Sequence, residues 1–193
     1  MFIQTEATPN PATLKFLPGR EVMADGATAN FRDADAAEGA SPLAAKLFAI
    51  PGVTGVFFGY DFVTITKEDG PAESPLEWAH LKPAILGAIM EHFLSGRPVM
   101  LEGDKEAAGD EFFDQADEEI VVTIKELLDT RVRPAVAQDG GDITFRGYEN
   151  GVVYLNMKGA CAGCPSSTAT LKHGIQNLLK HFIPEVQQVE QVA

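Results

Sequence analysis

Residues 139–166 read DGGDITFRGYENGVVYLNMKGACAGCPS, and this stretch predicts the fold of the second half of the chain. Two β-rich runs, 143–145 and 152–155, flank Asn150-Gly151, a pair typical of a tight hairpin turn. After the second run, a glycine-rich loop leads to Pro165, a residue favoured at the first position of a helix. The stretch therefore predicts a hairpin whose second strand ends in a loop that opens a helix.

Helices are predicted on both sides of this hairpin. Before it, residues 117–137 place apolar side chains, the last of them Ala135, at helical spacing, and Pro134 is expected to distort or end that helix. After it, residues 166–183 repeat apolar side chains every three or four positions, the last of them Phe182, until Pro184. Residues 186–189 are a candidate for a final short strand. The expected result is a small β-sheet packed against two helices.

The first hundred residues predict a second small domain of the same α+β class. Strands are expected at 2–6, 13–17, 53–58 and 62–66, with the last two joined as a hairpin. Ser41 is expected to cap a helix over residues 43–50. A second helix is predicted by the spacing of Trp78, Leu81, Ile85, Ile89 and Phe93, and Pro83 is expected either to open it or to lie early within it.

Charge is concentrated between these two regions. The chain has 193 residues, of which 28 are acidic and 15 basic, so its net charge is −13. Nine of the acidic residues and only one basic residue lie between Leu101 and Ile120. Self-repulsion makes this stretch a poor core former. We therefore expect domains at 1–97 and 111–193 joined by an acidic flexible linker at 98–110, with an acidic surface loop as the alternative.

Composition argues against several classes of protein. The negative charge argues against nucleic-acid binding, which requires a basic surface. The sequence has no apolar run of 18 residues, so no membrane span is expected. Its N-terminus has neither the pattern of a secretory signal nor that of a transit peptide. Two cysteines cannot build a disulfide framework, so a reducing cytoplasm is expected.

Both cysteines, Cys161 and Cys164, lie in the loop before the last predicted helix. The helix end should point N–H groups at the Cys164 sulfur and, with Lys158 and Lys172 nearby in sequence, lower the thiol pKa. Four interpretations remain open: buried packing, a redox dithiol, half of a zinc site, or half of an iron–sulfur site. His173, nine residues past Cys164, is expected to face solvent.

Counting ligands links the metal interpretations to oligomerisation. Zinc and iron–sulfur clusters both need four ligands, and this loop supplies two thiolates. His80 and His92 in the first half are 12 residues apart without an acidic pair, so surface or boundary positions are expected for them. A metal would therefore require a second copy of the chain, whose identical loop would complete four thiolates. A site that is open at a dimer interface suits a carrier that hands its metal on.

Two runs in the second half, residues 139–143 and 155–167, together resemble the C-terminal domain of the NifU (Nfu) family. This resemblance is specific because it joins two motifs at the right separation. The first hundred residues resemble the Nfu N-terminal domain. The matching segments there are 2–5, 8–11, 14–16, 47–53 and 78–96.

The resemblance implies an iron–sulfur cluster carrier and not an enzyme. Family members hold a 4Fe–4S cluster between two subunits through this cysteine pair and transfer it to apo-proteins, so Cys161 and Cys164 inherit the ligand role by position. Expected partners are apo iron–sulfur client proteins, upstream cluster-assembly proteins and a second copy in the loaded state. The alternatives are a thiol–disulfide oxidoreductase and an adaptor with a vestigial metal loop.

The resemblance also carries expectations for the first domain and for the compartment. This domain lacks the cysteines of the longer NifU scaffolds, so no second permanent cluster is expected. In the family it is thought to help recognise clients or donors. Because no transit peptide precedes Met1, the bacterial cytoplasm is expected, or the mitochondrial matrix for a processed chain.

Overall fold

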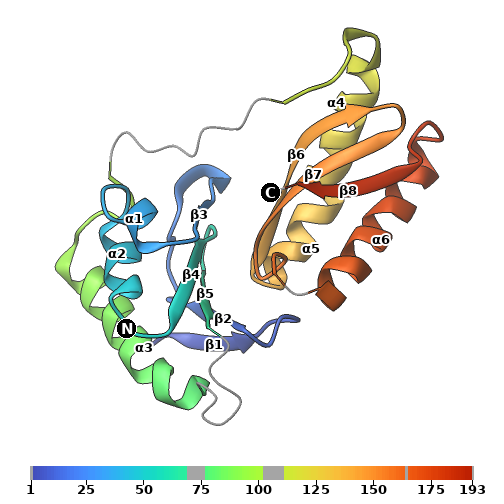
Figure 1. Ribbon diagram of the computed structural model, residues 1–193. Helices are drawn as coiled ribbons and strands as arrows, with labels where there is room; N and C mark the ends of the chain where they lie inside the picture. The colour runs from blue at the N-terminus through green and yellow to red at the C-terminus, as the bar shows by residue number, and fades with distance from the viewer. Residues whose placement is uncertain (1, 69–76, 102–110, 164, 193) are drawn as a thin grey trace. The chain divides into compact units, whose positions relative to one another are not determined.

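The computed structural model describes residues 2–68, 77–101, 111–163 and 165–192. The chain divides into two compact units, Met1–Glu106 and Ala107–Ala193. Each unit combines a β-sheet with helices (Figure 1), so the predicted α+β class is confirmed. Within the described ranges, no helix is both long enough and apolar enough to cross a bilayer.

The first unit is built on a five-stranded antiparallel sheet in the order β1-β2-β5-β4-β3. Its strands are β1 (Gln4–Ala7), β2 (Thr13–Leu17), β3 (Ala29–Phe31), β4 (Val53–Phe58) and β5 (Val63–Lys67). The predicted hairpin of β4 and β5 is confirmed, whereas β1 begins two residues later than expected. The short β3 was not predicted, because three residues cannot show an alternating pattern.

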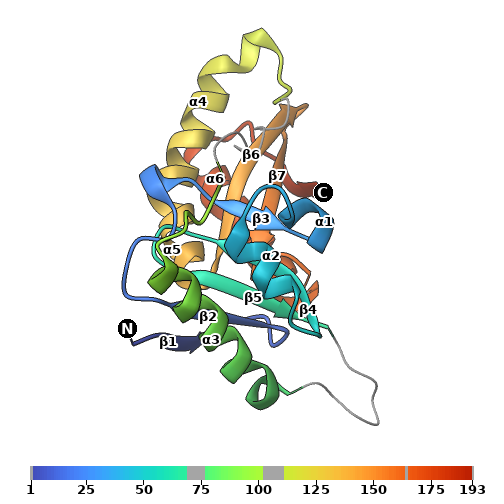
Figure 2. The same ribbon diagram turned by 90° about the vertical axis from the view of Figure 1, so that its left-hand side faces the viewer.

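Helices cover one face of this sheet, as Figures 1 and 2 show. They are the α-helices α1 (Ala34–Ala37), α2 (Pro42–Phe48) and α3 (Trp78–Ser95), while η1 (Ala24–Gly26) is a short 3₁₀ turn before β3. Ser41 caps α2 as predicted, because its Oγ accepts a hydrogen bond of 3.1 Å from the backbone N–H of Ala44. Pro83 lies inside α3, which was one of its two expected positions.

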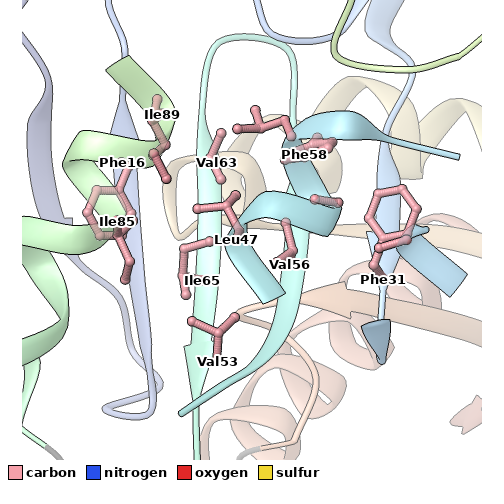
Figure 3. Packing of buried hydrophobic residues seen from close by; sticks show 14 of the residues in the cluster. Phe16, Phe31, Leu47, Val53, Val56, Phe58, Val63, Ile65, Ile85 and Ile89 are labelled. Carbon is pink, nitrogen blue, oxygen red and sulfur yellow. The ribbon is translucent and has the colours of Figure 1, made fainter. Parts of the chain in front are cut away.

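The core of the first unit lies between the sheet and helices α2 and α3 (Figure 3). Phe16 of β2, Phe58 of β4 and Ile65 of β5 are fully buried there. Leu47 of α2 and Ile85 of α3 pack against the same cluster and are also fully buried. Burying such side chains stabilises a fold by roughly 1.5–3 kcal/mol each, so this layer holds the helices on the sheet.

The described start of the predicted linker, residues 98–101, is attached to the first unit. The Ser41 hydroxyl donates a hydrogen bond of 2.5 Å to the carbonyl of Val99, and the N–H of Leu101 donates one of 2.8 Å to the carbonyl of Ala40. Val99 and Met100 also pack against the first core. Residues 102–110 of the linker lie outside the described residues, so the domain boundaries stay a prediction.

The second unit has a three-stranded sheet in the order β6-β7-β8. The strands are β6 (Gly141–Glu149), β7 (Val152–Gly159) and β8 (Gln188–Val192). The expected hairpin between β6 and β7 is confirmed: Asn150 (φ +50°) and Gly151 (φ +81°) both take left-handed conformations. β8 starts two residues later than its predicted counterpart and pairs in parallel with β7.

Two helical segments pack on this sheet (Figure 1). The first consists of η2 (Gln115–Asp117), α4 (Glu118–Leu127), a π-helical segment η3 (Leu128–Val132) and α5 (Arg133–Gln138), and the second is α6 (Pro165–Phe182). Pro134 lacks an N–H group and crowds the preceding turn. The helix therefore widens into the π-helical segment η3 just before Pro134, and the predicted distortion at this proline is confirmed.

This distortion changes which residues reach the core of the second unit. Val136 is buried, whereas Ala135, expected on the apolar face, is exposed. In α6 the buried residues include Ile175 and Leu179, whereas Phe182 is 45% exposed, contrary to its expected place on the apolar face. Sequence spacing correctly placed buried Ile124, Val132 and Ile175, and it missed the buried positions by one residue only toward the end of each helical segment.

Candidate functional site

The cysteine loop follows β7 and precedes α6, as predicted. Gly159 (φ +61°) and Gly163 (φ +87°) take left-handed conformations on either side of Cys161, which lets the chain reverse direction within a few residues. Pro165 is the first residue of α6, as expected. Cys161 is 6% exposed and belongs to the core of the second unit. Cys164 lies outside the described residues, so its predicted role stays a prediction.

The backbone of this loop is held by neighbouring elements. The N–H of Ala160 donates a hydrogen bond of 3.2 Å to the carbonyl of Gly140. The hydroxyl of Thr168, in the first turns of α6, donates one of 3.1 Å to the carbonyl of Cys161. These bonds join the end of β7 to the turn before β6 and to the start of α6. Residues 139–142 thus contact the cysteine loop directly, a link that the sequence did not reveal.

Gly141, the first residue of β6, lies against Cys161. A Cβ atom placed on Gly141 would come within 2.5 Å of the Cys161 Sγ and 2.7 Å of the Lys158 carbonyl oxygen. No side chain larger than hydrogen fits there without movement of the loop. The glycine pair in residues 139–142 therefore serves the cysteine loop as well as the turn.

Burial, followed by the negative charges of Asp139 and Asp142, raises the pKa of the Cys161 thiol to about 12. The lowered pKa predicted for the thiol at the helix end concerns Cys164, which lies outside the described residues, so it stays a prediction; the pKa of Cys161 is shifted in the opposite direction. One expected source of positive charge is also engaged elsewhere, because the Lys172 ammonium lies 2.6 Å from the Glu190 carboxylate. In this conformation Cys161 is a neutral buried thiol at pH 7.

A partly buried ion pair fixes the start of β6. Arg133 of α5 holds Asp142 in a bidentate pair, with Nε 2.8 Å from Oδ1 and Nη2 3.0 Å from Oδ2. This hydrogen bonding holds the pKa of Arg133 above its usual value. The remaining guanidinium nitrogen, Nη1, lies 3.1 Å from Asp129 Oδ1, four residues earlier in the same helical segment. Sequence reasoning missed this pair, because nothing in a spacing of nine residues across a helix, a turn and a strand indicates contact.

A single chain does not supply a complete metal site within its described part. Those residues contain no group of three or more His, Cys, Asp or Glu side chains that could hold a metal. His173 is exposed on α6, as expected. A thiolate is the ligand type that iron–sulfur clusters require. Cys161 is therefore a suitable ligand for such a cluster, but by itself it supplies too few of the ligands needed.

The histidines of the first unit differ from one another. His80 is exposed, as expected, but His92 is 3% exposed, so the predicted surface or boundary position is wrong for it. It follows Leu81, Ile85 and Ala88 at helical spacing on the buried face of α3, a signal that the sequence did contain. Burial, followed by the positive charges of Lys46 and Arg97, lowers the pKa of His92.

Known protein families match both units of the chain. The family described as "Scaffold protein Nfu/NifU N terminal" matches residues 3–96, and the "NifU-like domain" matches residues 124–190. A "NFU1 iron-sulfur cluster scaffold homolog, mitochondrial" from Drosophila ananassae is 54% identical over 192 residues, which is all of this chain and 64% of that protein. A protein of the same name from Drosophila sechellia is 53% identical, again over all of this chain and 65% of its own length. The chain thus spans just under two thirds of these relatives.

Among solved structures, a NifU-like protein from Saccharomyces cerevisiae is 26% identical, with a TM-score of 0.45, over 53% of this chain and 86% of that one. The two family matches follow each other along the chain in the order that the residue patterns predict, and the second includes the whole cysteine loop. The chain belongs to the Nfu/NifU family of scaffold proteins, with an Nfu N-terminal domain followed by a NifU-like domain.

Proposed function

We propose that this protein carries an iron–sulfur cluster, held between two copies of the chain, and transfers it to apo-proteins. Cys161 and Cys164 of each copy would bind one 4Fe–4S cluster through four thiolates. The observation that carries the proposal is the match of the NifU-like domain to residues 124–190, which include both cysteines of the chain. The names of the relatives, which call them iron–sulfur cluster scaffold homologs, support the same cargo.

The ligand count supports the involvement of two copies. One chain offers two thiols, and its described residues add no further cluster of metal-binding side chains. A cluster held by only two bonds per chain exchanges ligands more readily than one enclosed by four ligands of a single chain. Transfer would proceed by stepwise replacement of these thiolates by those of a client. The partners would be apo iron–sulfur proteins and the upstream proteins that assemble the cluster.

The main rival is a catalytic dithiol, and the buried position of Cys161 suits it no better than it suits cluster binding. An attacking thiol in such an enzyme is accessible and has a lowered pKa. Cys161 is buried and its pKa is raised. For the compartment, the mitochondrial relatives support the matrix for a eukaryotic chain, and the cytoplasm is the proposal for a bacterial one.

Anaerobic reconstitution with iron and sulfide tests the proposal. The parent chain should become coloured, sediment as a dimer and contain about four iron per dimer. Cys161→Ser and Cys164→Ser should each abolish loading, while His173→Ala, which changes an exposed residue of α6, should load like the parent.

The loaded protein should then restore activity to an apo iron–sulfur enzyme. A Cys161→Ser chain that still binds four iron per dimer would contradict the ligand assignment. A colourless monomer that reduces disulfides would favour the oxidoreductase instead, and a dimer containing zinc would indicate a structural site.

A further inference from the structure

The Cys161 side chain lies inside the second unit. It is 6% exposed and belongs to the same buried cluster as Ile143 and Met157. A thiol that binds a cluster shared with a second copy has to reach the surface, because the remaining ligands come from outside the chain. The described conformation therefore stores the thiol in a position from which it cannot bind such a cluster.

The space for this stored thiol comes from Gly141. A Cβ on residue 141 would meet the Cys161 Sγ at 2.5 Å and the Lys158 carbonyl oxygen at 2.7 Å, both too close for a real Cβ to remain without movement. Gly141 is absent from the glycines with positive φ, so its backbone conformation does not require glycine. Packing against Cys161 and the adjacent loop explains why this position lacks a side chain. By contrast, a Cβ on Gly174 of α6 would meet nothing within 4 Å.

The loop backbone around the thiol is anchored independently of this space. Ala160 is bonded to the Gly140 carbonyl, and the Cys161 carbonyl accepts from Thr168. The position of Sγ is therefore set by the space beside Gly141, and not by the loop moving as a whole.

We infer that Gly141 is a positioning residue for Cys161: the space left by its missing side chain stores the thiol inside the cluster-free chain, and the thiol becomes a ligand by leaving that space. Only the last step, from an outward thiol to a bound cluster, rests on the proposed function. Storage of the thiol is a property of the chain alone and is measurable without iron.

The test measures alkylation of a single thiol in the metal-free full-length chain. Cys164→Ser leaves Cys161 as the only cysteine, and iodoacetamide modification is followed by intact mass. The reference is an exposed thiol, introduced as His173→Cys in a chain that also carries Cys161→Ser and Cys164→Ser. We expect Cys161 to react about 100-fold more slowly than this reference, since reaction requires an accessible thiolate. Reaction within about threefold of the reference would overturn storage of the thiol.

Adding Gly141→Ala to the Cys164→Ser chain should speed alkylation of Cys161 by about tenfold or more, because the added methyl group displaces Sγ. The control is Val153→Ala, which removes fully buried methyl groups from the same core. If alkylation required unfolding of the whole unit, Val153→Ala would accelerate it as much as Gly141→Ala does. Equal acceleration, or no acceleration by Gly141→Ala, would overturn the role of Gly141.

Circular dichroism shows whether Gly141→Ala folds. If it does not, the combination with Cys161→Ala decides: recovery of the fold supports a conflict with the thiol, and no recovery overturns it. Slow alkylation of Cys161 in the Cys164→Ser chain, together with a parent chain that never loads iron, would contradict the proposed function while leaving storage intact, so the two failures are distinguishable.

Discussion

Replacing Arg133 by Met should destabilise the second unit more than replacing its partner Asp142 by Asn. Asp142 is nearly buried, with 5% of its side chain exposed, whereas Arg133 is 33% exposed and also contacts Asp129. Arg133→Met leaves a buried carboxylate without the guanidinium, and breaking a buried pair in this way typically costs 3–5 kcal/mol. Because Arg133 is partly solvated, we expect the lower end of that range, about 3 kcal/mol.

Asp142→Asn should destabilise the second unit less, because both side chains of the pair keep hydrogen-bond partners. The guanidinium keeps Asp129 and water as partners, and the asparagine oxygen still accepts one hydrogen bond. The loss is then that of a charge-assisted hydrogen bond replaced by a neutral one, about 1 kcal/mol. The Arg133→Met protein should therefore be less stable than the Asp142→Asn protein, by about 2 kcal/mol.

Hydrogen exchange of the amides of β6 and β7, read by mass spectrometry, measures this difference in the full-length chain. The only tryptophan, Trp78, lies in the first unit, so its fluorescence during urea unfolding provides an internal control that should not change. A loss of less than about 1 kcal/mol of stability in Arg133→Met would contradict this prediction, and so would a larger loss in Asp142→Asn.

Three further predictions concern single positions. Ser41→Ala removes the cap of α2 and should lower the stability of the first unit by about 1–2 kcal/mol, read as an earlier urea midpoint of Trp78 fluorescence. Gly174→Ala, at an exposed helix position with open space, should raise the stability of the second unit by about 0.5–1 kcal/mol in hydrogen exchange, and a loss would contradict the described packing. The pKa of His92 is lowered by burial, so the unfolded chain binds more protons below about pH 6.5 and the first unit should lose stability as the pH falls through this range. His92→Gln should reduce that slope and His80→Gln, at an exposed position, should not.

Much of the architecture is predictable from local patterns in the chain. Turn chemistry at Asn150-Gly151, the cap at Ser41 and the break at Pro134 each act within a few residues, and each appears in the structure as expected. Helical spacing likewise located α3 and α6. Errors appear where a local pattern depends on its surroundings: the π turn before Pro134 moved burial from Ala135 to Val136, and three-residue β3 gave no pattern at all.

The candidate site is likewise predictable from local patterns only in part. The order of the residues is enough to show that two thiols lie in one glycine-rich loop before a helix, and therefore how many thiolate ligands one chain can offer. The burial of Cys161 against Gly141 and the pairing of Arg133 with Asp142 depend instead on how the elements pack in three dimensions. These contacts join residues 9 to 20 positions apart on different elements. A local pattern has no means of specifying them, because the distance between such side chains is set by how the helices pack on the sheet.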